Sequence, residues 1–275
     1  MIEIPEAIVL SQQIKDVLMG KRIDYVIANQ SPHKFAWFFG EPNAYDRRLS
    51  GKIIEKACAY GGYIEISLGT TRLLFSEGVN LRYLIKGEKL PQKHQLLLGF
   101  EDESMLIASI QMYGGMWSFE EGEFDNIYYK VAKEKPSPLS KDFDFKYYEQ
   151  ILKDESLQKK SAKALLATDQ RIPGLGNGVL QDILFNAKIH PKRKVSTLSD
   201  KEIKGIFNSI KSTLHEMVLK GGRDTEKDLF RCSGGYITKL SKKTVKYPCK
   251  VCGGQIIKKA YLGGSIYYCE GCQQE

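Results

Sequence analysis

The sequence predicts an α+β protein of more than one domain, with an N-terminal helix and a β-sandwich, then a helical part, then a C-terminal zinc hairpin held by four cysteines. Three observations support this order. Strand-like runs fill the region from residue 23 to about 129, helical periodicity begins after residue 144, and two C-x2-C pairs occur near the end of the chain. The 275 residues, 42% of them hydrophobic, are enough for two domains.

The predicted domain limits follow changes in composition. Residues 1–132 form the helix and β-sandwich domain, residues 145–240 the helical domain and residues 241–275 the zinc hairpin, with a polar, proline-containing linker over residues 133–144. No apolar run approaches the length of a membrane span, and acids stand at the N-terminus where a signal peptide carries bases. We therefore expect a soluble cytoplasmic protein without a membrane partner.

The first predicted element is a helix over residues 4–19. Pro5 suits its first turn, Glu6 lies near the positive end of the helix dipole, and Gly20 ends the helix. Glu3 stands just before it. A carboxylate at this place is commonly a cap or a dipole partner, and the residues alone leave that ordinary role and a chemical role open.

Short strands follow the helix. Alternating or β-prone runs cover residues 63–68, 71–75, 95–100 and 105–111, and strands at this spacing predict a β-sandwich or barrel. An aromatic group precedes them and could either stack on bases or belong to the sheet core. Its members are Phe35, Trp37, Phe38, Phe39 and Tyr45.

Helices dominate the next part of the chain. Residues 145–152, 162–168 and 179–187 are candidate short helices. A capping box that begins at Ser199 opens a long amphipathic helix, which ends at Gly221-Gly222.

A glycine-rich loop precedes the third short helix. Gly174 and Gly176 allow the backbone to approach a phosphate closely, and the start of the helix near Asn177 offers free N–H groups and a positive dipole end. A plain turn between two helices explains the same residues equally well.

Four cysteines have the spacing of a structural zinc site. Cys249 and Cys252 form one C-x2-C pair and Cys269 and Cys272 the other, and a β-prone segment with a Gly-Gly turn lies between the pairs. Two such pairs complete a tetrahedron of thiolates and leave no position open for water. A disulfide pair or four unused thiols are the alternatives.

Lysines and arginines are concentrated in the second half. Residues 1–145 contain 17 of them against 20 acids, whereas residues 146–275 contain 24 against 13, and the whole chain has a net charge of +8. A basic half that carries a zinc hairpin favours a nucleic-acid partner, because neutralised phosphates release condensed counterions. A basic surface that serves only solubility is the alternative.

Motifs at both ends resemble those of the formamidopyrimidine-DNA glycosylase and endonuclease VIII family of base-excision repair enzymes. The start Glu3-Ile4-Pro5-Glu6 is similar to the family's P-E-L-P-E opening. The resemblance implies a two-domain clamp on damaged double-stranded DNA, with a helix-two-turn-helix module in the helical domain, and a monomer associated with the nucleoid. The other matching motifs are D-Q-R and G-L-G-N within residues 169–177, A-K-I-H-P at 187–191, G-G-Y at 234–236 and the cysteine segment at 248–273.

The resemblance also implies roles for individual residues, since these enzymes flip a damaged base out of the duplex before acting on it. Glu3 would be the acid/base carboxylate and Glu6 would lie at the pocket for the flipped base. Asn177, with Gly174 and Gly176 beside it, would hold a phosphate near the flipped nucleotide.

Several family positions differ in this chain. Ile2 stands where bifunctional members have a proline whose amine attacks the sugar and forms a Schiff base. Gly62 stands at the position of a family lysine, although Lys56 is nearby in the sequence. Met112 and Tyr113 replace an arginine-phenylalanine pair and could still wedge apolar surface into the base stack. An arginine of the zinc hairpin is replaced by Gly264.

These departures favour a DNA glycosylase that releases a damaged base by hydrolysis at Glu3, without an efficient β-lyase step. A labile glycosidic bond, such as that of an alkylated purine, would suit so reduced a site. The alternatives are a catalytically inactive protein of the same fold that binds damaged DNA, and an RNA-binding protein that reuses the helical module. Lyase activity could survive only through Lys56, Lys52 or the amine of Met1.

Overall fold

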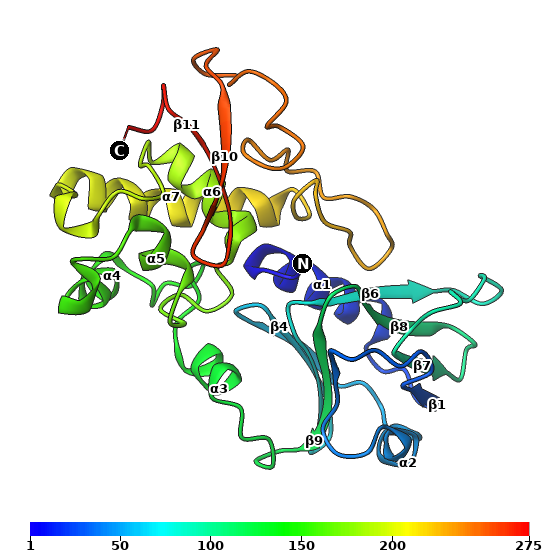
Figure 1. The fold of residues 1–275 in the computed structure, drawn as a ribbon. Helices are drawn as coiled ribbons and strands as arrows, with labels where there is room; N and C mark the ends of the chain where they lie inside the picture. The colour runs from blue at the N-terminus through cyan, green and yellow to red at the C-terminus, as the bar shows by residue number, and fades with distance from the viewer. Residues whose placement is uncertain (275) are drawn as a thin grey trace.

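Helix α1 (Ile4–Leu18) lies between the two halves of the molecule in the computed structural model, which describes residues 1–274 (Figure 1). Ala7 and Ile14 belong to the core of the N-terminal half. Ile4 belongs to the core of the helical half. Because this helix contributes to both cores, the residue that precedes it, Glu3, is held at the junction.

The N-terminal half contains two sheets whose inner faces share one hydrophobic core, so the predicted β-sandwich is confirmed. All pairings are antiparallel except the one between β2 and β9. One sheet has the order β2 (Ala36–Trp37), β9 (Gly114–Glu120), β5 (Thr71–Phe75), β4 (Tyr63–Leu68), β3 (Lys56–Tyr60). The other has the order β1 (Ile23–Ala28), β7 (Leu96–Phe100), β8 (Met105–Ile110), β6 (Val79–Leu84).

Two helical segments of this half are not among the predicted elements. A 3-10 turn (Pro42–Ala44) leads into helix α2 (Tyr45–Leu49), and helix α3 (Ile127–Glu134) crosses the domain limit expected at residue 132. Asn126 caps α3 through a hydrogen bond from the N–H of Tyr129. Tyr129 also packs on the sheet, so α3 is attached to the sandwich rather than forming part of a free linker.

The aromatic group before the strands is divided between two environments. Tyr45 is fully buried, and its hydroxyl accepts hydrogen bonds from the N–H groups of Phe39 and Ser118. Phe35 and Trp37 are each 45% exposed. The sheet-core prediction is therefore right for Tyr45, while Trp37 remains available for a ligand.

The helical half follows the predicted order. Its helices are α4 (Phe145–Leu152), α5 (Ala162–Ala167), α6 (Asn177–Asn186) and α7 (Asp200–Leu219), with 3-10 turns at Glu155–Leu157 and Val195–Thr197. The capping box at the start of α7 is present: the Ser199 hydroxyl accepts from the N–H of Glu202, and the Glu202 carboxylate accepts from the N–H of Ser199. None of the helices within residues 1–274 combines the length and the apolar composition that a membrane span requires.

The C-terminal hairpin consists of β10 (Ile256–Tyr261) and β11 (Gly264–Cys269) and is docked on α6. Gln181 of α6 makes the connection: its amide nitrogen donates to the carbonyl of Ser265 at 3.0 Å, and its amide oxygen accepts from the N–H of Tyr267 at 2.9 Å. Gln273 ties the end of the hairpin to the carbonyl of Ile189 at 2.9 Å. The hairpin is thus fixed relative to the helices.

Candidate active site

Glu3 caps a helix that begins far along the chain. Its Oε1 accepts a hydrogen bond from the N–H of Gly178 and its Oε2 accepts one from Val179, both at 2.8 Å, so the side chain joins the start of α1 to the first turn of α6. Burial raises the pKa of this carboxyl above its ordinary value of 4.5, although the nearby Arg223 acts in the opposite direction. The capping role that the sequence left open is therefore present, but the capped helix is α6 and not α1.

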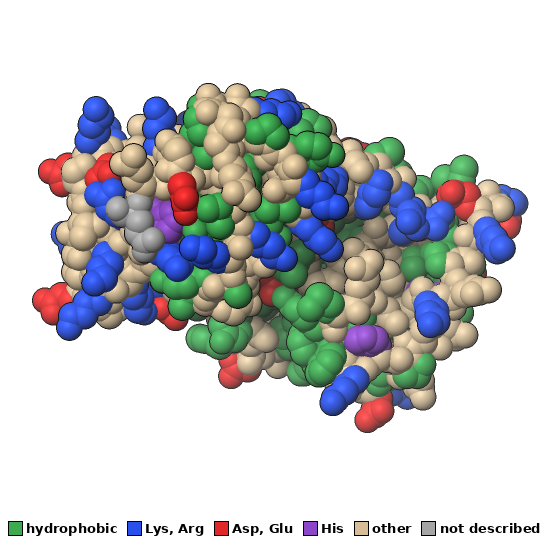
Figure 2. All heavy atoms as spheres, turned by 45° about the horizontal axis from the view of Figure 1, so that its top comes forward, with side chains coloured by type: hydrophobic (Ala, Val, Ile, Leu, Met, Phe, Trp, Pro, Cys, Tyr) green, Lys and Arg blue, Asp and Glu red, His purple; other side chains and the backbone are tan. Residues whose placement is uncertain are grey.

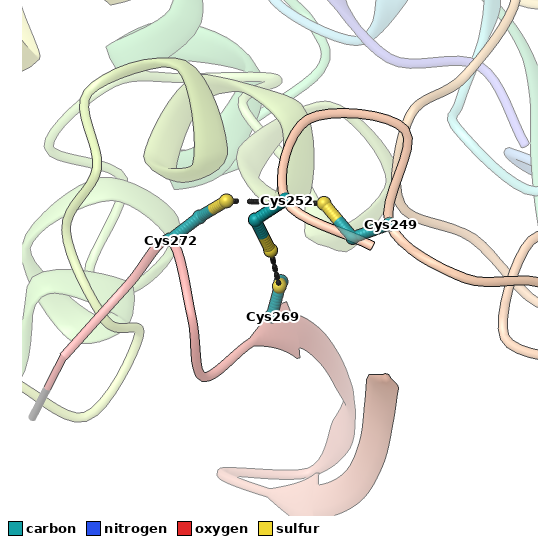
Figure 3. A group of neighbouring side chains, drawn as sticks. All are labelled: Cys249, Cys252, Cys269 and Cys272. Carbon is teal, nitrogen blue, oxygen red and sulfur yellow. Dashed lines mark hydrogen bonds between the residues drawn. The ribbon is translucent and has the colours of Figure 1, made fainter. Parts of the chain in front are cut away.

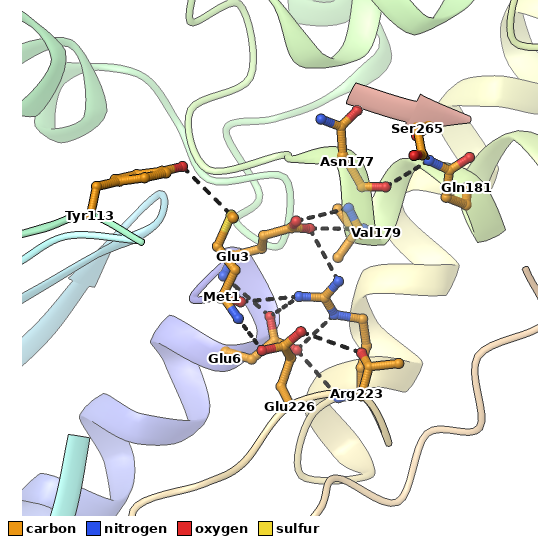
Figure 4. A network of polar contacts seen from close by, with 12 residues as sticks. Met1, Glu3, Glu6, Tyr113, Asn177, Val179, Gln181, Arg223, Glu226 and Ser265 are labelled. Atoms are coloured by element: carbon orange, nitrogen blue, oxygen red, sulfur yellow. Dashed lines mark hydrogen bonds and ion pairs between the residues drawn. The ribbon is translucent and has the colours of Figure 1, made fainter. Parts of the chain in front are cut away.

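A buried arginine separates Glu3 from Glu6 (Figure 4). Arg223 Nε donates to Glu6 Oε1 at 2.9 Å, Nη2 donates to Glu6 Oε2 at 2.7 Å, and Nη1 lies 3.5 Å from Glu3 Oε2. All three side chains are at most 5% exposed. Burial alone lowers the pKa of the guanidinium, but the two carboxylates outweigh it and the pKa of Arg223 is raised. The three residues, called the buried triad below, depend on one another because an unpaired charge is costly in the interior.

Glu6 does not reach open space. Both of its oxygens accept from Arg223, and Oε2 also accepts from the N–H of Glu3 at 3.2 Å. The free space beside Glu6 and Gly222 measures about 10 Å³, which is too small for a base. The structure therefore shows Glu6 paired with Arg223 beside a small space, and not at a pocket for a base as the resemblance implies.

The N-terminal amine is bound to another acid. Met1 N forms an ion pair with Glu226, and the carbonyl of Met1 accepts a hydrogen bond from Arg223 Nη2 at 3.3 Å. Ile2 is 4% exposed and belongs to the sandwich core. Ile2 thus contributes to the packing of the core, and the amine of Met1 is paired with Glu226.

A cleft of about 600 Å³ opens in front of Glu3, at the junction of the two halves. It brings together Met112, Tyr113 and Asn177, which the sequence analysis named for DNA contact. Met112 is 70% exposed there. Three further lining residues, Glu77, Arg223 and Glu226, were not predicted, because nothing in their local sequence places them beside Glu3.

Tyr113 is held at the cleft by two neighbours. Its hydroxyl donates to Glu77 Oε1 at 3.1 Å, and its ring lies 5.9 Å from that of Trp37. Burial and the negative charge of Glu77 raise the pKa of Tyr113 to about 12, so the hydroxyl stays protonated at neutral pH. A side chain at Gly78 would collide with the carbonyl of Tyr113, since a Cβ there would lie 1.9 Å from that oxygen.

Gly174 and Gly176 line the cleft but do not form a phosphate cradle. Gly174 has φ +77°, and a Cβ on it would lie 2.2 Å from the nitrogen of Gly62 in the β3–β4 turn. A Cβ on Gly176 would lie 2.6 Å from Glu3 Oε1. Two of the N–H groups expected to bind an anion already donate to Glu3. The glycines are therefore required for close packing, and the start of α6 is capped by a carboxylate instead of a phosphate.

Asn177, which lines the cleft, lies next to Gly264 of the hairpin. Asn177 is exposed at the start of α6, and a Cβ on Gly264 in the hairpin would lie 2.5 Å from its side-chain nitrogen. The glycine thus makes room for the amide. The structure does not bring Lys56 to this group: it pairs with Ser67 at one end of β3, whereas the end that reaches Gly62 and the cleft is Tyr60.

The four cysteines of the hairpin lie within 4.8 Å of one another, sulfur to sulfur, and could hold a metal ion (Figure 3). The separations are 3.8 Å between Cys249 and Cys272 and 3.3 Å between Cys252 and Cys269. Both are far longer than a disulfide bond of about 2.05 Å. Sulfur atoms bound tetrahedrally to one zinc ion at about 2.3 Å would be about 3.8 Å apart. The donor set and its spacing therefore fit the predicted site.

Basic side chains gather on the face of the molecule that presents the hairpin. Figure 2 shows Lys and Arg in a band that runs across both halves and borders the hollow between them. One basic residue of the helical half, Arg193, is already paired with an acid, since its Nη1 lies 3.2 Å from Glu202 Oε1. A positive band beside the cleft suits a polyanion that lies across the junction.

Comparison with known proteins agrees with the arrangement of these elements. Residues 135–228 match the family model described as the formamidopyrimidine-DNA glycosylase H2TH domain. The formamidopyrimidine-DNA glycosylase of Syntrophomonas wolfei is 30% identical over 82% of this chain and 84% of that protein. That of Listeria monocytogenes is 28% identical over 99% of both chains.

Solved structures of the same kind share the fold. The MutM (Fpg) protein of Thermus thermophilus superimposes with a TM-score of 0.81 at 20% identity, covering 99% of both chains. Lactococcus lactis Fpg, in a complex with DNA that contains an abasic site, superimposes with a TM-score of 0.84 at 24% identity over 99% of this chain and all of that one. The predicted order of sandwich, helix-two-turn-helix module and cysteine hairpin is confirmed by this likeness.

Proposed function

The chain belongs to the formamidopyrimidine-DNA glycosylase family, and on this premise we propose that it is a DNA repair glycosylase that binds damaged double-stranded DNA and releases a flipped base by hydrolysis. Its relatives bear the name of such an enzyme, and the Lactococcus lactis protein is solved with abasic DNA. The cleft between the two halves is the place where the flipped nucleotide would lie.

One observation carries the hydrolytic proposal: Glu3 is a buried acid that lines this cleft and is held in place by hydrogen bonds. Two backbone N–H groups and Arg223 hold its carboxylate in one orientation. Each carboxylate oxygen can accept a second hydrogen bond, so Glu3 retains capacity to bind and deprotonate a water molecule. Its raised pKa makes it a stronger base than an ordinary glutamate.

The N-terminus supports hydrolysis without an efficient lyase step. A Schiff base requires a free amine near the sugar. The second residue is a buried isoleucine, and the amine of Met1 is paired with Glu226. Lys56 lies at the far end of β3. We therefore assign base release to Glu3 and water.

The remaining residues serve DNA binding in this proposal. Asn177 contacts a phosphate beside the flipped nucleotide, and Met112 and Tyr113 insert into the space that the base leaves. Glu6 acts through Arg223 as a partner of Glu3 and not as a base contact. The protein acts as a monomer.

The four cysteines bind one structural zinc ion in this proposal, and Cys269→Ser tests it. We expect the variant to lose its zinc, to disorder the hairpin and to bind duplex DNA about tenfold more weakly, because the hairpin lies beside the cleft. Zinc content and Kd by fluorescence anisotropy measure both effects. Cys232→Ser, an exposed cysteine outside the cluster, is the control. Full zinc content in the Cys269 variant would contradict the assignment.

The direct test of the function is mass spectrometry of bases released from duplexes that carry a panel of oxidised and alkylated bases. We expect at least one damaged base to be released by the wild-type protein and none from undamaged duplex. A protein that binds the damaged duplexes tightly and releases nothing would instead be the catalytically inactive damaged-DNA binder. The saturated hydrogen bonding of Glu6 is the observation that favours this second function.

A further inference from the structure

A second hollow of about 430 Å³ adjoins the cleft on the side of the sandwich. The two spaces share Glu77, Tyr113, Gln170 and Gly174 in their linings. Its volume falls in the range of about 300–1,000 Å³ that small-molecule sites occupy. A planar base that swings out of a duplex into the cleft can therefore continue into this hollow.

Aromatic rings form the walls of this hollow, which we call the aromatic chamber. They belong to Trp37, Tyr63, Tyr113, Trp117 and Tyr128. The rings of Trp37 and Tyr113 are 5.9 Å apart and inclined by 37°, and those of Tyr63 and Trp117 are 6.4 Å apart and inclined by 41°. Such walls offer π faces on which a nucleobase stacks.

Gly115 leaves room for the ring of Trp117. A Cβ on Gly115 would lie 2.0 Å from the Trp117 indole, so the glycine is required for the ring to lie over the strand. Trp37 is 45% exposed and Tyr128 is 56% exposed, so the outer rim remains accessible to a ligand.

The lining of the chamber is negatively charged. Among its described residues Glu77 is the charged one, and the Glu77 side chain is exposed at the boundary with the cleft. A cation held over electron-rich rings beside a carboxylate is stabilised by both, whereas a neutral base gains only stacking. The chamber thus favours a positively charged aromatic ligand.

Gln170 contributes a buried polar atom to the lining. Its Oε1 accepts no hydrogen bond from any group within residues 1–274. A buried unpaired acceptor has a strong preference for a ligand that donates to it. The amino group of a purine base is a donor of this kind.

From these observations we propose that the aromatic chamber receives the flipped base and selects a cationic, N-alkylated purine. This inference rests on the proposed function and names its substrate class. The space beside Glu6 is too small for a base, whereas the chamber is large enough for one and adjoins the cleft that Glu3 lines.

The chemistry of such a base suits a site in which Glu3 is the proposed base and the amine of Met1 is paired with Glu226. In an N7-alkylated guanine nucleotide the bond from C1′ to N9 breaks, and its electron pair neutralises the positive ring. The oxygen of a water molecule bonds to C1′, and its proton passes to Glu3. The products are a neutral alkylated base and an abasic sugar, so no further acid has to protonate the leaving base.

Tryptophan fluorescence tests the chamber without catalysis, because both tryptophans of the chain line it. The probes are 7-methylguanosine, at mildly acidic pH where its ring is fully cationic, and guanosine as the neutral match. We expect saturable quenching with at least about fivefold tighter binding of 7-methylguanosine. Glu77→Gln should remove most of this preference, whereas Glu101→Gln, an exposed acid paired with Arg22, should keep it. Glu3→Gln should also keep it.

Release of 7-methylguanine from duplex DNA by the wild-type protein is measured in parallel. Preferential quenching with Glu3-dependent release supports both the chamber and the glycosylase function. Preferential quenching without release of 7-methylguanine or of any other base in the panel supports the chamber and removes the glycosylase function. Quenching that is absent, or equal for the two nucleosides, overturns the chamber proposal, even if another damaged base is released.

Discussion

Glu3→Gln is expected to slow base release by about a hundred- to ten-thousand-fold, the usual contribution of a general base. The amide oxygen of glutamine can still accept from one of the two N–H groups of α6, so the variant keeps its fold. It cannot take a proton from water. DNA affinity should stay at the wild-type level, because the change removes a negative charge and no phosphate contact. Single-turnover release and anisotropy titration measure the two quantities separately.

The pH profile of base release gives an independent check on Glu3. Hydrolysis needs the ionised carboxylate, and burial raises its pKa above 4.5. The rate should therefore fall, as pH is lowered, at a higher pH than for an ordinary glutamate. Arg223 lowers this pKa, so the acid limb of an Arg223 variant should move to still higher pH. If the acid limb of the Arg223 variant stays in place or moves to lower pH, a group other than Glu3 controls the rate.

Arg223→Met is expected to destabilise the protein by about 3–5 kcal/mol at neutral pH, because it leaves the carboxylates of Glu3 and Glu6 buried without their cation. For a chain of this length that corresponds to a fall in Tm of roughly 10 °C. Arg22→Met removes an exposed arginine paired with Glu101 and should change Tm little. Thermal unfolding followed by circular dichroism measures both variants.

The destabilisation caused by Arg223→Met should become smaller as the pH falls. Without Arg223 the folded-state pKa of Glu3 rises further above its unfolded value, so the folded state binds the proton more tightly than the unfolded state does. The loss of stability is thus full above the folded pKa and disappears towards the unfolded value of 4.5. The added change Glu6→Gln should restore part of the lost stability at neutral pH. A constant deficit across pH would contradict the buried triad.

Much of the fold follows from local sequence. The capping box at Ser199 predicted the start of α7, alternation predicted β4, a β-prone run predicted β5, and cysteine spacing predicted the hairpin. Helix α3 was missed because its tyrosines are also strand formers, and packing of Tyr129 on the sheet decides the outcome. Local propensity cannot report such a tertiary contact.

The site was only partly predictable for the same reason. Glu3, Met112, Tyr113 and Asn177 were identified from motifs, and the cleft brings them together. The partner of Glu6 was not identified, because it is Arg223, which lies 217 positions away in the chain. The Gly-Gly pair before Arg223 indicates only the end of a helix. The glycines before α6 suggested a phosphate site, and only the fold shows that a carboxylate from the other end of the chain already caps that helix.

The most direct test of hydrolysis at Glu3 is borohydride reduction during turnover on a damaged duplex that the protein processes. An imine between an amine and C1′ would be reduced to a stable protein–DNA adduct, whereas attack by water leaves no bond between protein and DNA for borohydride to trap. With Ile2 buried and Met1 paired with Glu226, we predict released base with no adduct on a denaturing gel. A covalent adduct, mapped to Met1 or to a lysine, would contradict hydrolysis by Glu3 and make the protein a lyase.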